Sequence, residues 1–481
     1  MPLVAGVDSS TQACTIVVRD ADDGRLVAQA EAAHPPASPP VSEQHPEAWW
    51  TAFQHAAQRL DLGSVAAVSI DGQGHGLVPL DTRCRVIRPA KLWNDTTASP
   101  EARELVERLG SAEWARRTGV VPVSAITVAK LLWLRRHEPA SFDRLATILL
   151  PPDYLGWRLT DRFVTDRSEG SGTGYMDATT SRWDIGLLDL VDEERDWAAM
   201  LPHVNGPNEA AGQVTAAAAA ATGLPEGALV GPGANDQPVC ALSLGIIGED
   251  VLISLGTSGT VSVRTRAPVS DPTGAVTGVA DAAGAYRPLV CTLNATRVTD
   301  TFAGILGVDF EALAAMALAA PGDPRRPVVV PYLDGERTPD RPRATGTLAR
   351  LRVGVTREQV ARAAFEGVLC GLLGGLRALE RVGVPGDGRV ILTGGGAASP
   401  AYRQLLADLV GRPVHVSDLT ETSASGAAVQ AAAVLHGRPV DEIVEAWAPA
   451  LRVVAEPRSD QAVDELMARY HRVVVVEELD D

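Results

Sequence analysis

Aromatic side chains are scarce in this sequence. Phe, Trp and Tyr make up 4% of the 481 residues, whereas hydrophobic residues as a whole make up 46%. The cores must therefore be built mainly from Ala, Val and Leu. Charged residues account for 21%, which is typical of a folded globular protein and argues against a disordered chain. The chain is too long for one ordinary core, so two domains of roughly 240 residues each are expected.

Cysteine pairs, a leader segment and long hydrophobic runs are also missing. The five cysteines are scattered and none belongs to a Cys-x-x-Cys pair, which predicts reduced thiols in a cytosolic protein. Residues 1–10 enter a strand pattern directly and lack the basic and apolar regions of a signal peptide. No apolar run reaches the roughly 18 residues that a membrane-spanning helix needs. We therefore expect a cytoplasmic protein.

Runs of positive charge are absent as well. Asp and Glu number 60 against 43 Lys and Arg, which gives a net charge of −17. A chain this acidic repels nucleic acid and anionic membranes, so neither is an expected partner. A phosphate-bearing ligand must then be held by local groups, namely backbone N–H groups, helix N-termini and metal ions.

The sequence does contain one order of elements that occurs twice. Three strands, a helix and a fourth strand are expected at 3–10, 14–20, 25–31, 46–60 and 65–72. Three strands, a long helix and a fourth strand are expected again at 251–259, 260–265, 287–295, 356–383 and 388–396. Hairpins followed by a crossover to a parallel strand predict a mixed sheet. We therefore expect an α/β protein of two duplicated domains, with helices flanking the sheets and a ligand cleft between the domains.

Two turns rich in Ser, Thr and Gly occupy matching places in the two halves. GVDSSTQ (6–12) puts Asp8 at the end of a strand, where a carboxylate can hold Mg²⁺ while the turn N–H groups face a phosphate. LGTSGT (255–260) is its counterpart. Taken alone, each turn is better explained as an ordinary hairpin. As a matched pair across a cleft, the turns would grip a polyphosphate from both sides.

Two further stretches bring polar or glycine residues to strand ends. TGGGAAS (393–399) follows a strand and precedes a capped helix, where glycines admit a ligand close to the backbone and the helix N-terminus favours anions. GQGHGLV (72–78) and LWND (92–95) carry side chains that hydrogen-bond to a polyol or stack on it. Packing in the core is the alternative for His75 and Trp93.

A single carboxylate, Asp236, stands between a Gly and a Pro in GANDQPV (233–239). It is either a helix cap or the group that carries the chemistry. The stretch falls near the expected crossing from the first half to the second, where a carboxylate would reach ligands held by both halves.

Along the chain, these motifs appear in the order of one family. The stretches GVDSST, SEQHPEAWW, GQGHG, VIRPAKLWND, GPGANDQ, SLGTSGT, PYLDGERTP and LTGGGAASPAYRQLLADLVG resemble those of the FGGY carbohydrate kinases over almost the full length, and most closely the xylulokinase branch. The resemblance implies an actin-like, ribonuclease-H-like duplicated fold. It implies transfer of the γ-phosphate of ATP to a ketopentose, D-xylulose, with Mg²⁺ as cofactor and D-xylulose 5-phosphate as product.

The resemblance also assigns regions and residues. It implies a sugar-binding FGGY domain at 1–246 and a nucleotide-binding one at 247–481, whose last helix can pack back on the first domain; a dimer is common in the family. It makes Asp236 the general base and assigns the metal to Asp8 and Asp236. It assigns the sugar to Gly74, His75, Trp93, Asn94, Asp95, Asp236 and Gln237. It assigns ATP to Ser10, Thr11, Gly256, Thr257, Ser258, Gly395, Gly396 and Ala397.

Two departures from the family pattern leave the substrate open. Gly74 stands where Met is common, which predicts a wider sugar pocket, and Gln237 is one methylene longer than the usual Asn. A kinase for another ketose or polyol, such as ribulose, an alditol or glycerol, is therefore an alternative. A non-catalytic sugar-binding protein of the same fold is a further alternative, which the presence of Asp8, Asp236 and both phosphate turns argues against. An actin-like filament protein would leave the sugar motifs unexplained.

Overall fold

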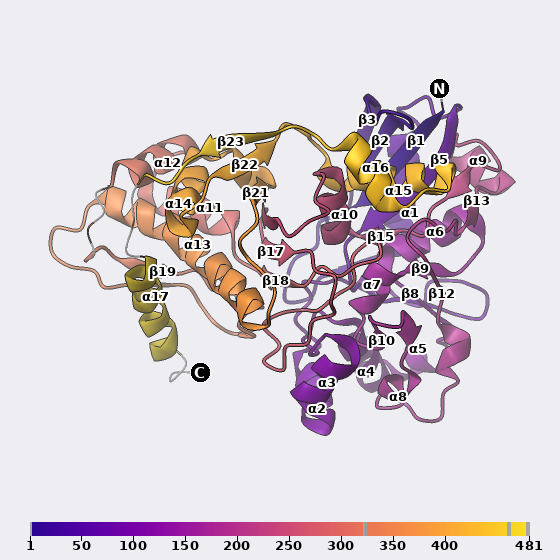
Figure 1. The fold of residues 1–481 in the computed structure, drawn as a ribbon. Helices are drawn as coiled ribbons and strands as arrows, with labels where there is room; N and C mark the ends of the chain where they lie inside the picture. Colours follow the sequence, from indigo (N-terminus) through magenta and orange to yellow (C-terminus); the bar gives the residue numbers. More distant parts are fainter. Residues whose placement is uncertain (1, 321–322, 324, 459–462, 478–481) are drawn as a thin grey trace. The chain divides into compact units, whose positions relative to one another are not determined.

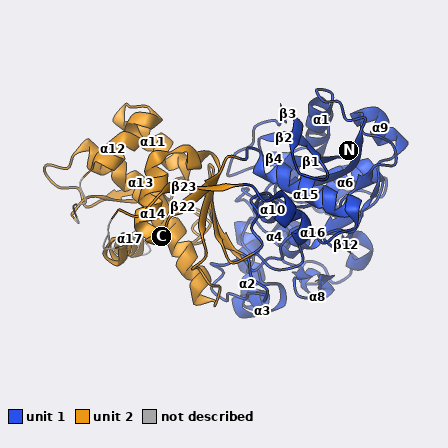
Figure 2. Cartoon of the chain, turned by 45° about the horizontal axis from the view of Figure 1, so that its top comes forward, with its two compact units in different colours: residues 1–247, 264–287, 419–449 blue, residues 248–263, 288–418, 450–481 orange. Residues whose placement is uncertain are grey.

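The computed structural model describes residues 2–320, 323, 325–458 and 463–477. The chain forms two compact units (Figure 2). It passes from one unit to the other five times, at 247/248, 263/264, 287/288, 418/419 and 449/450. The domain boundary near residue 246 stays a prediction. Which unit binds the sugar and which the nucleotide stays a prediction. Unit 1 consists of residues 1–247, 264–287 and 419–449, and unit 2 of residues 248–263, 288–418 and 450–481.

Unit 1 is built on a mixed sheet with the strand order β13-β14-β5-β1-β2-β3, with β15 also beside β5 (Figure 1). The first three strands are antiparallel neighbours, as the turn at Asp22–Gly24 predicts. β1 then runs parallel to β5, and β5 parallel to β14. The strands are β1 (Leu3–Ser9), β2 (Ala13–Asp20), β3 (Leu26–Ala33), β5 (Val65–Gly72), β13 (Gly212–Gln213), β14 (Leu229–Val230) and β15 (Ala234–Asn235).

Helices cover both faces of this sheet. Alternate residues of a strand point to opposite faces, so Ala5 and Val7 pack with one apolar cluster and Val4 with another. The first cluster includes residues of α1, α6 and α9, and the second residues of α10, α15 and α16. These helices are α1 (Pro46–Ala57), α6 (Pro151–Thr160), α9 (Ala216–Thr222), α10 (Asp236–Ser243), α15 (Thr422–His436) and α16 (Val440–Trp447).

Unit 2 repeats the same sheet topology. Its strand order is β18-β17-β16-β21-β22-β23, with antiparallel neighbours β16, β17 and β18 and parallel neighbours β16, β21 and β22. The duplication read from the sequence is therefore confirmed. The strands are β16 (Val251–Leu255), β17 (Gly259–Val263), β18 (Leu289–Thr292), β21 (Val390–Thr393), β22 (Val414–Ser417) and β23 (Leu451–Ala455). The helices are α11 (Thr296–Leu306), α12 (Phe310–Ala319), α13 (Arg357–Arg381), α14 (Pro400–Val410) and α17 (Val463–Glu477).

Most of the remaining elements belong to residues 43–205 of unit 1, where the sequence pattern predicted few helices or strands. In unit 1 they are β4 (Glu43–Gln44), β6 (Val78–Leu80), β7 (Ala90–Lys91), α2 (Ser99–Leu109), α3 (Ser111–Thr118), α4 (Thr127–His137), α5 (Pro139–Asp143), β8 (Thr147–Leu149), β9 (Val164–Asp166), α7 (Arg167–Ser171), β10 (Met176–Asp177), β11 (Arg182–Trp183), α8 (Ile185–Leu188), the 3₁₀ turn η1 (Trp197–Met200) and β12 (His203–Asn205). Unit 2 adds β19 (Val328–Val330), β20 (Thr347–Ala349) and the 3₁₀ turn η2 (Gly395–Ala398).

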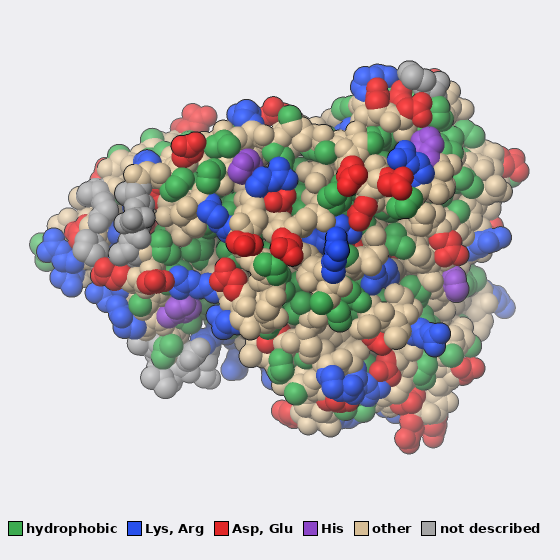
Figure 3. Space-filling model, in the orientation of Figure 1, with side chains coloured by type: hydrophobic (Ala, Val, Ile, Leu, Met, Phe, Trp, Pro, Cys, Tyr) green, Lys and Arg blue, Asp and Glu red, His purple; other side chains and the backbone are tan. Residues whose placement is uncertain are grey.

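Three features can be compared with the partners and the compartment expected from the sequence: the surface charge, the length and composition of the helices, and the state of the cysteines. On the face drawn in Figure 3, acidic and basic side chains are interspersed. No single helix among the described residues has the length and apolar composition to cross a membrane; α11 and α12 meet that criterion only as a pair, which is bent by 90°. All five cysteines are free thiols.

Candidate active site

Three carboxylates converge at one end of the unit 1 sheet. Asp8, the second-last residue of β1, is in register with Asp71 of the parallel neighbour β5. Asp71 is in turn in register with Ala234 of β15, and Asp236 follows as the first residue of α10. Register partners in parallel strands point to the same face, so Asp8 and Asp71 share the face on which Val4 packs with α10 and α15. Asp71 was not among the predicted site residues.

Burial raises the pKa of all three carboxyls, and the charge of a neighbouring carboxylate adds to it for Asp8 and Asp71. Asp71 is 0% exposed, and neither of its carboxylate oxygens, nor Oδ1 of Asp8, has a hydrogen-bond partner among the described residues. Burial, and then the charge of Asp236, raises the pKa of Asp8; burial, and then the charge of Asp8, raises the pKa of Asp71 well above its usual 3.8. Burial raises the pKa of Asp236 to about 6, against hydrogen bonds from Gln237. The cluster thus concentrates buried carboxylate oxygens that lack donors.

Replacing Asp71 by Asn should stabilise the ligand-free protein at pH 8. A carboxyl whose pKa is raised on folding favours the folded state only while protonated, so the free energy of unfolding that it contributes falls as pH rises through the folded pKa. The amide has no charge to bury. The Tm of the variant should exceed that of the wild type at pH 8, by a margin that shrinks at pH 5.

Thermal unfolding at the two pH values measures this effect. Asp143→Asn is the control, because its side chain is 80% exposed and its Tm difference should be near zero at both values. A lower Tm for Asp71→Asn than for the wild type at pH 8 would contradict the electrostatic reading of the cluster.

Asp236 is the first helical residue of α10, and its neighbour is the cap. Asn235 has the extended backbone of an N-cap (φ −73°, ψ 142°), and its side-chain oxygen accepts a hydrogen bond from the backbone N–H of Gln237 (3.2 Å). The interpretation of Asp236 as the helix cap is therefore wrong. A carboxylate in the first turn of a helix is stabilised in its ionised form by the helix dipole, and Asp236 remains partly exposed.

The hydroxyl-rich turn after β1 is joined to a residue predicted to contact the sugar. Thr11 Oγ1 donates to Gln73 Oε1 (3.1 Å) and accepts from the indole N–H of Trp93 (3.0 Å). Ser10 Oγ donates to the carbonyl three residues further on (3.1 Å), and Gln44 Nε2 donates to the carbonyl of Thr11 (2.9 Å). The turn and Trp93 therefore form one hydrogen-bonded assembly. Gln44 and Gln73 complete it; Gln73 belongs to the stretch GQGHGLV expected to contact a polyol, whereas Gln44 was not predicted.

His75 lies in a strained turn that three side chains fix. Its φ of +64° is in the left-handed region, which is uncommon for a residue other than glycine. Its N–H donates to Glu169 Oε1 (3.1 Å), and its carbonyl accepts from Lys130 Nζ (2.6 Å) and Thr127 Oγ1 (3.1 Å). The position of the predicted sugar contact is thus set by residues of α4 and α7.

The space beside Gly74 is filled. A methyl group built on Gly74 would lie 2.0 Å from Nδ2 of Asn235. The Asn235 side chain therefore occupies the room next to Gly74 that a larger residue would take, and a wider sugar pocket at this position stays a prediction.

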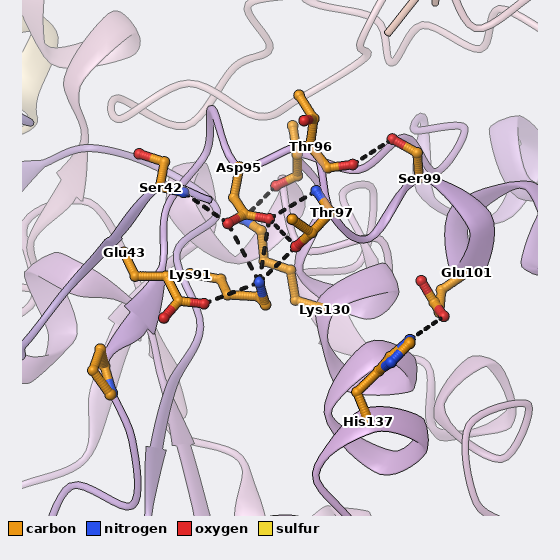
Figure 4. A network of polar contacts seen from close by, with 12 residues as sticks. Ser42, Glu43, Lys91, Asp95, Thr96, Thr97, Ser99, Glu101, Lys130 and His137 are labelled. Carbon is orange, nitrogen blue, oxygen red and sulfur yellow. Dashed lines mark hydrogen bonds and ion pairs between the residues drawn. The ribbon is translucent and has the colours of Figure 1, made fainter. Parts of the chain in front are cut away.

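Asp95 lies in a buried polar network on the loop after β7 (Figure 4). Its carboxylate accepts from the backbone N–H groups of Ser42 and Thr97 (both 2.9 Å) and pairs with the buried Lys91 (3.3 Å). These contacts hold the loop that carries Trp93 and Asn94. The Oδ1 atom of Asn94 is buried and has no hydrogen-bond partner among the described residues. Sugar contact by Asp95 and Asn94 stays a prediction.

Unit 2 brings the other residues predicted to bind ATP together. The carbonyls of Gly256 and Thr257, in the turn between β16 and β17, each accept a backbone hydrogen bond from the start of α11 (3.0 Å). Residues 395–397 follow β21, the parallel neighbour of β16, and a methyl group on Gly396 would lie 2.8 Å from Cβ of Leu255. A methyl group on Gly395 would meet no atom within 4 Å. The turns at 256–258 and 395–397 are therefore neighbours, and Gly395 borders open space.

Comparison with known proteins matches this arrangement. The model of the FGGY family of carbohydrate kinases, N-terminal domain, matches residues 3–243, and that of the C-terminal domain matches residues 251–435. The chain is 41% identical to a xylulose kinase of Streptomyces coelicolor over 452 residues, which are 93% of this chain and 91% of that protein. It is 40% identical to a xylulose kinase of Streptomyces rubiginosus over 472 residues, 97% and 95% of the two chains.

A solved structure gives the same result for the fold. The crystal structure of xylulose kinase from Bifidobacterium adolescentis is 38% identical, superimposes with a TM-score of 0.86, and covers 98% of this chain and 99% of that chain. The predicted fold class, an actin-like α/β protein with duplicated mixed sheets flanked by helices, is confirmed.

Proposed function

The chain belongs to the FGGY family of carbohydrate kinases, and we propose that it transfers the γ-phosphate of ATP to O5 of D-xylulose, giving D-xylulose 5-phosphate. The observation that carries the proposal is the position of Asp236. It is a partly exposed carboxylate at a helix N-terminus, beside Asp8 and Asp71, in a chain 40–41% identical to xylulose kinases. ATP is the phosphoryl donor, as for the family.

Asp236 acts as the general base. Phosphoryl transfer requires an attacking hydroxyl in line with the γ-phosphate and a group that takes its proton. Asp236 accepts the proton from O5, a contribution of about 10²–10⁴ in rate, or roughly 3–5 kcal/mol at about 1.4 kcal/mol per tenfold. His75, Trp93, Asn94 and Gln237 hold the sugar so that O5 faces this carboxylate.

The carboxylate cluster fits a magnesium ion. Mg²⁺ prefers oxygen ligands and is usually held by one or two carboxylates together with water and substrate phosphates. The donorless oxygens of Asp8 and Asp71 meet that requirement, with Asp236 beside them. Among the described residues no group of three or more His, Cys, Asp or Glu side chains is spaced to enclose a metal by itself, which agrees with an ion that arrives with ATP. When bound, the ion neutralises charge on the transferring phosphate.

The turns hold the phosphates. Backbone N–H groups at Thr11, Thr257 and Ser258 bind phosphate oxygens without any cluster of basic side chains, as a chain of net charge −17 requires. The N–H groups of Ser10 and Gly256 already donate to the carbonyls of Ala13 (3.0 Å) and Ser258 (2.9 Å) within their own turns. Gly395, Gly396 and Ala397 leave open space for the nucleotide next to the second turn. The sugar is assigned to unit 1 and the nucleotide to unit 2.

A coupled ADP-release assay over a panel of acceptors tests the proposal. The purified protein should release ADP with D-xylulose at the highest kcat/KM, and with a lower kcat/KM for D-ribulose, xylitol and glycerol. Release without any acceptor should be slow. A higher kcat/KM for an alditol would replace D-xylulose as the substrate, and no acceptor-dependent release with the whole panel would contradict a kinase function.

The proposal also covers where the protein is located and its oligomeric state. Five free thiols are in keeping with a reducing cytoplasm. A homodimer is the proposed state, and mass photometry at micromolar and nanomolar concentration tests it.

A further inference from the structure

Glu169 joins two parts of the candidate active site that are far apart in the sequence. Its side chain is 0% exposed. One carboxylate oxygen, Oε1, accepts from the backbone N–H of His75 (3.1 Å), and the other, Oε2, accepts from Nδ2 of Asn235 (2.8 Å). The first partner belongs to the turn predicted to contact the sugar, and the second is the cap of the helix that begins with Asp236. A single buried carboxylate thus spans the sugar turn and the helix of the base.

Three polar atoms of Asn235 are engaged. Its Oδ1 caps α10 by accepting from Gln237 N, its Nδ2 donates to Glu169, and its own N–H donates to Ser168 Oγ (3.1 Å). Because the cap fixes the first turn of α10, the direction in which Asp236 leaves the backbone depends on where Glu169 and Ser168 hold Asn235.

The contact exists because residue 74 has no side chain. A methyl group on Gly74 would lie 2.0 Å from Nδ2 of Asn235 and 3.2 Å from Oε2 of Glu169. The hydrogen bond between Asn235 and Glu169 therefore passes through the volume that any other residue at 74 would fill.

Hydrogen bonds to the backbone hold Glu169 in place. It lies in the first turn of α7, where the carboxylate of the N-cap Asp166 accepts from the backbone N–H groups of both Ser168 and Glu169 (2.8 Å each). On the other side, Lys130 holds the carbonyl of His75 (2.6 Å). Groups locked in this way keep a site within the small tolerance that catalysis requires.

We propose that Glu169 is a positioning residue that sets the distance between the bound sugar and Asp236, acting through the Asn235 amide in the space left by Gly74. Because Glu169 fixes both the turn at His75 and the cap of α10, the sugar and its base move together. This rests on the proposed function, since it assumes that Asp236 is the base and that the turn at His75 holds the acceptor.

The polarity of the hydrogen bonds makes the proposal testable with isosteric changes. Glu169 accepts from two N–H donors. A Gln at 169 has one acceptor and one donor, so in Glu169→Gln one of the two bonds becomes a contact between two donors. In Asn235→Asp, the oxygen that replaces Nδ2 faces the Glu169 carboxylate. When the two changes are combined, the Gln amide donates to the Asp carboxylate and every hydrogen bond in the chain is satisfied again.

Steady-state kinetics of the two single variants and the double variant is the test, run with the acceptor that the wild type phosphorylates best. Each single change should lower kcat/KM for the acceptor by about 10-fold to 100-fold, the range expected for displacement of a reacting group. The KM for ATP should stay within about twofold. The double variant should return to within about threefold of the wild type, a coupling typical of residues in direct contact.

Amide hydrogen exchange over the first turn of α10 gives a readout independent of turnover. Protection there should fall in both single variants and recover in the double. Glu101→Gln is the matched control, because Glu101 is equally buried (1% exposed) but pairs with His137 and Arg136 in α4; it should leave the acceptor KM and this exchange unchanged.

The variant Gly74→Ala gives a second, independent test of the same contact. The added methyl group should displace the Asn235 amide and reduce kcat/KM as the Glu169 variant does, and Asn235→Gly in the same chain should relieve the clash, so the two losses should be less than additive. Additive losses in both cycles, with unchanged exchange, would overturn the positioning role. If the wild type phosphorylates no acceptor, the proposed function fails, and unchanged exchange in the single variants would separately overturn the link itself.

Discussion

Asp236→Asn should lower kcat by about 10²–10⁴-fold, the contribution expected of a general base, while D-xylulose and ATP still bind. Asn has the shape of Asp and fits the first turn of α10, so the substitution removes the proton acceptor and leaves the surrounding structure nearly unchanged. The residues proposed to hold the sugar and the phosphate turns stay intact. Calorimetric titration with each substrate should give dissociation constants close to those of the wild type, and the coupled assay should show the loss.

The pH dependence of the wild type gives an independent check on this carboxylate. Burial raises the pKa of Asp236 to about 6, and a base must be ionised, so kcat/KM should fall as the pH drops through about 6. The residual rate of Asp236→Asn should lack this acid limb. Asp143→Asn, on an exposed side chain, should keep both the rate and the limb. A rate for Asp236→Asn within about threefold of the wild type would contradict the assignment of the base.

Gly6→Ala should destabilise unit 1 by about 3 kcal/mol or more, the upper end of the usual range for overpacking. A methyl group there would lie 1.9 Å from the carbonyl oxygen of Ala424 and 2.4 Å from the backbone N of Ala428. Both atoms belong to the backbone of α15, so no flexible side chain can yield. The helix would have to move away from β1, which carries Asp8. A Tm lower by about 6–12 °C is expected at about 2–4 °C per kcal/mol.

Gly156→Ala is the matched control, with the opposite sign. Gly156 lies inside α6, and a methyl group there would meet no atom within 4 Å. Replacing an interior helix glycine by alanine in open space should stabilise by about 0.5–1 kcal/mol. Differential scanning calorimetry of both variants tests the packing of α15 on β1. A Tm for Gly6→Ala equal to that of the wild type would contradict this close approach.

Much of the fold could be predicted from the sequence, because its signals are local. The hairpins of both sheets are predicted by the apolar runs at 3–9 and 251–255 and by the turns that follow them. The long helix expected from residue 356 does begin there, since the Thr356 hydroxyl caps it by accepting from Gln359 N. The residues expected to bind ATP from unit 2 are neighbours in the structure, because they follow two strands that pair in parallel.

The rest depends on contacts between distant parts of the chain. Asp71 looked like the end of an ordinary strand, and only the register of β5 on β1 places it beside Asp8. Glu169 meets partners 94 and 66 residues away. Gly74 predicted open space, which Asn235 fills from another segment. Residues 419–449, which form α15 and α16, belong to unit 1. The local sequence does not predict this, because an alanine-rich helix can pack equally well on either sheet.

The identity of the product shows whether the protein transfers phosphate to O5 of D-xylulose. Incubation of the purified protein with ATP, Mg²⁺ and D-xylulose, followed by phosphorus and carbon NMR of the phosphorylated sugar, reports which hydroxyl receives the phosphate. The predicted result is a single phosphate ester at C5, formed in equal amount with ADP and absent when Asp236 is replaced by Asn. An ester at another carbon, or ADP release without any sugar phosphate, would contradict it.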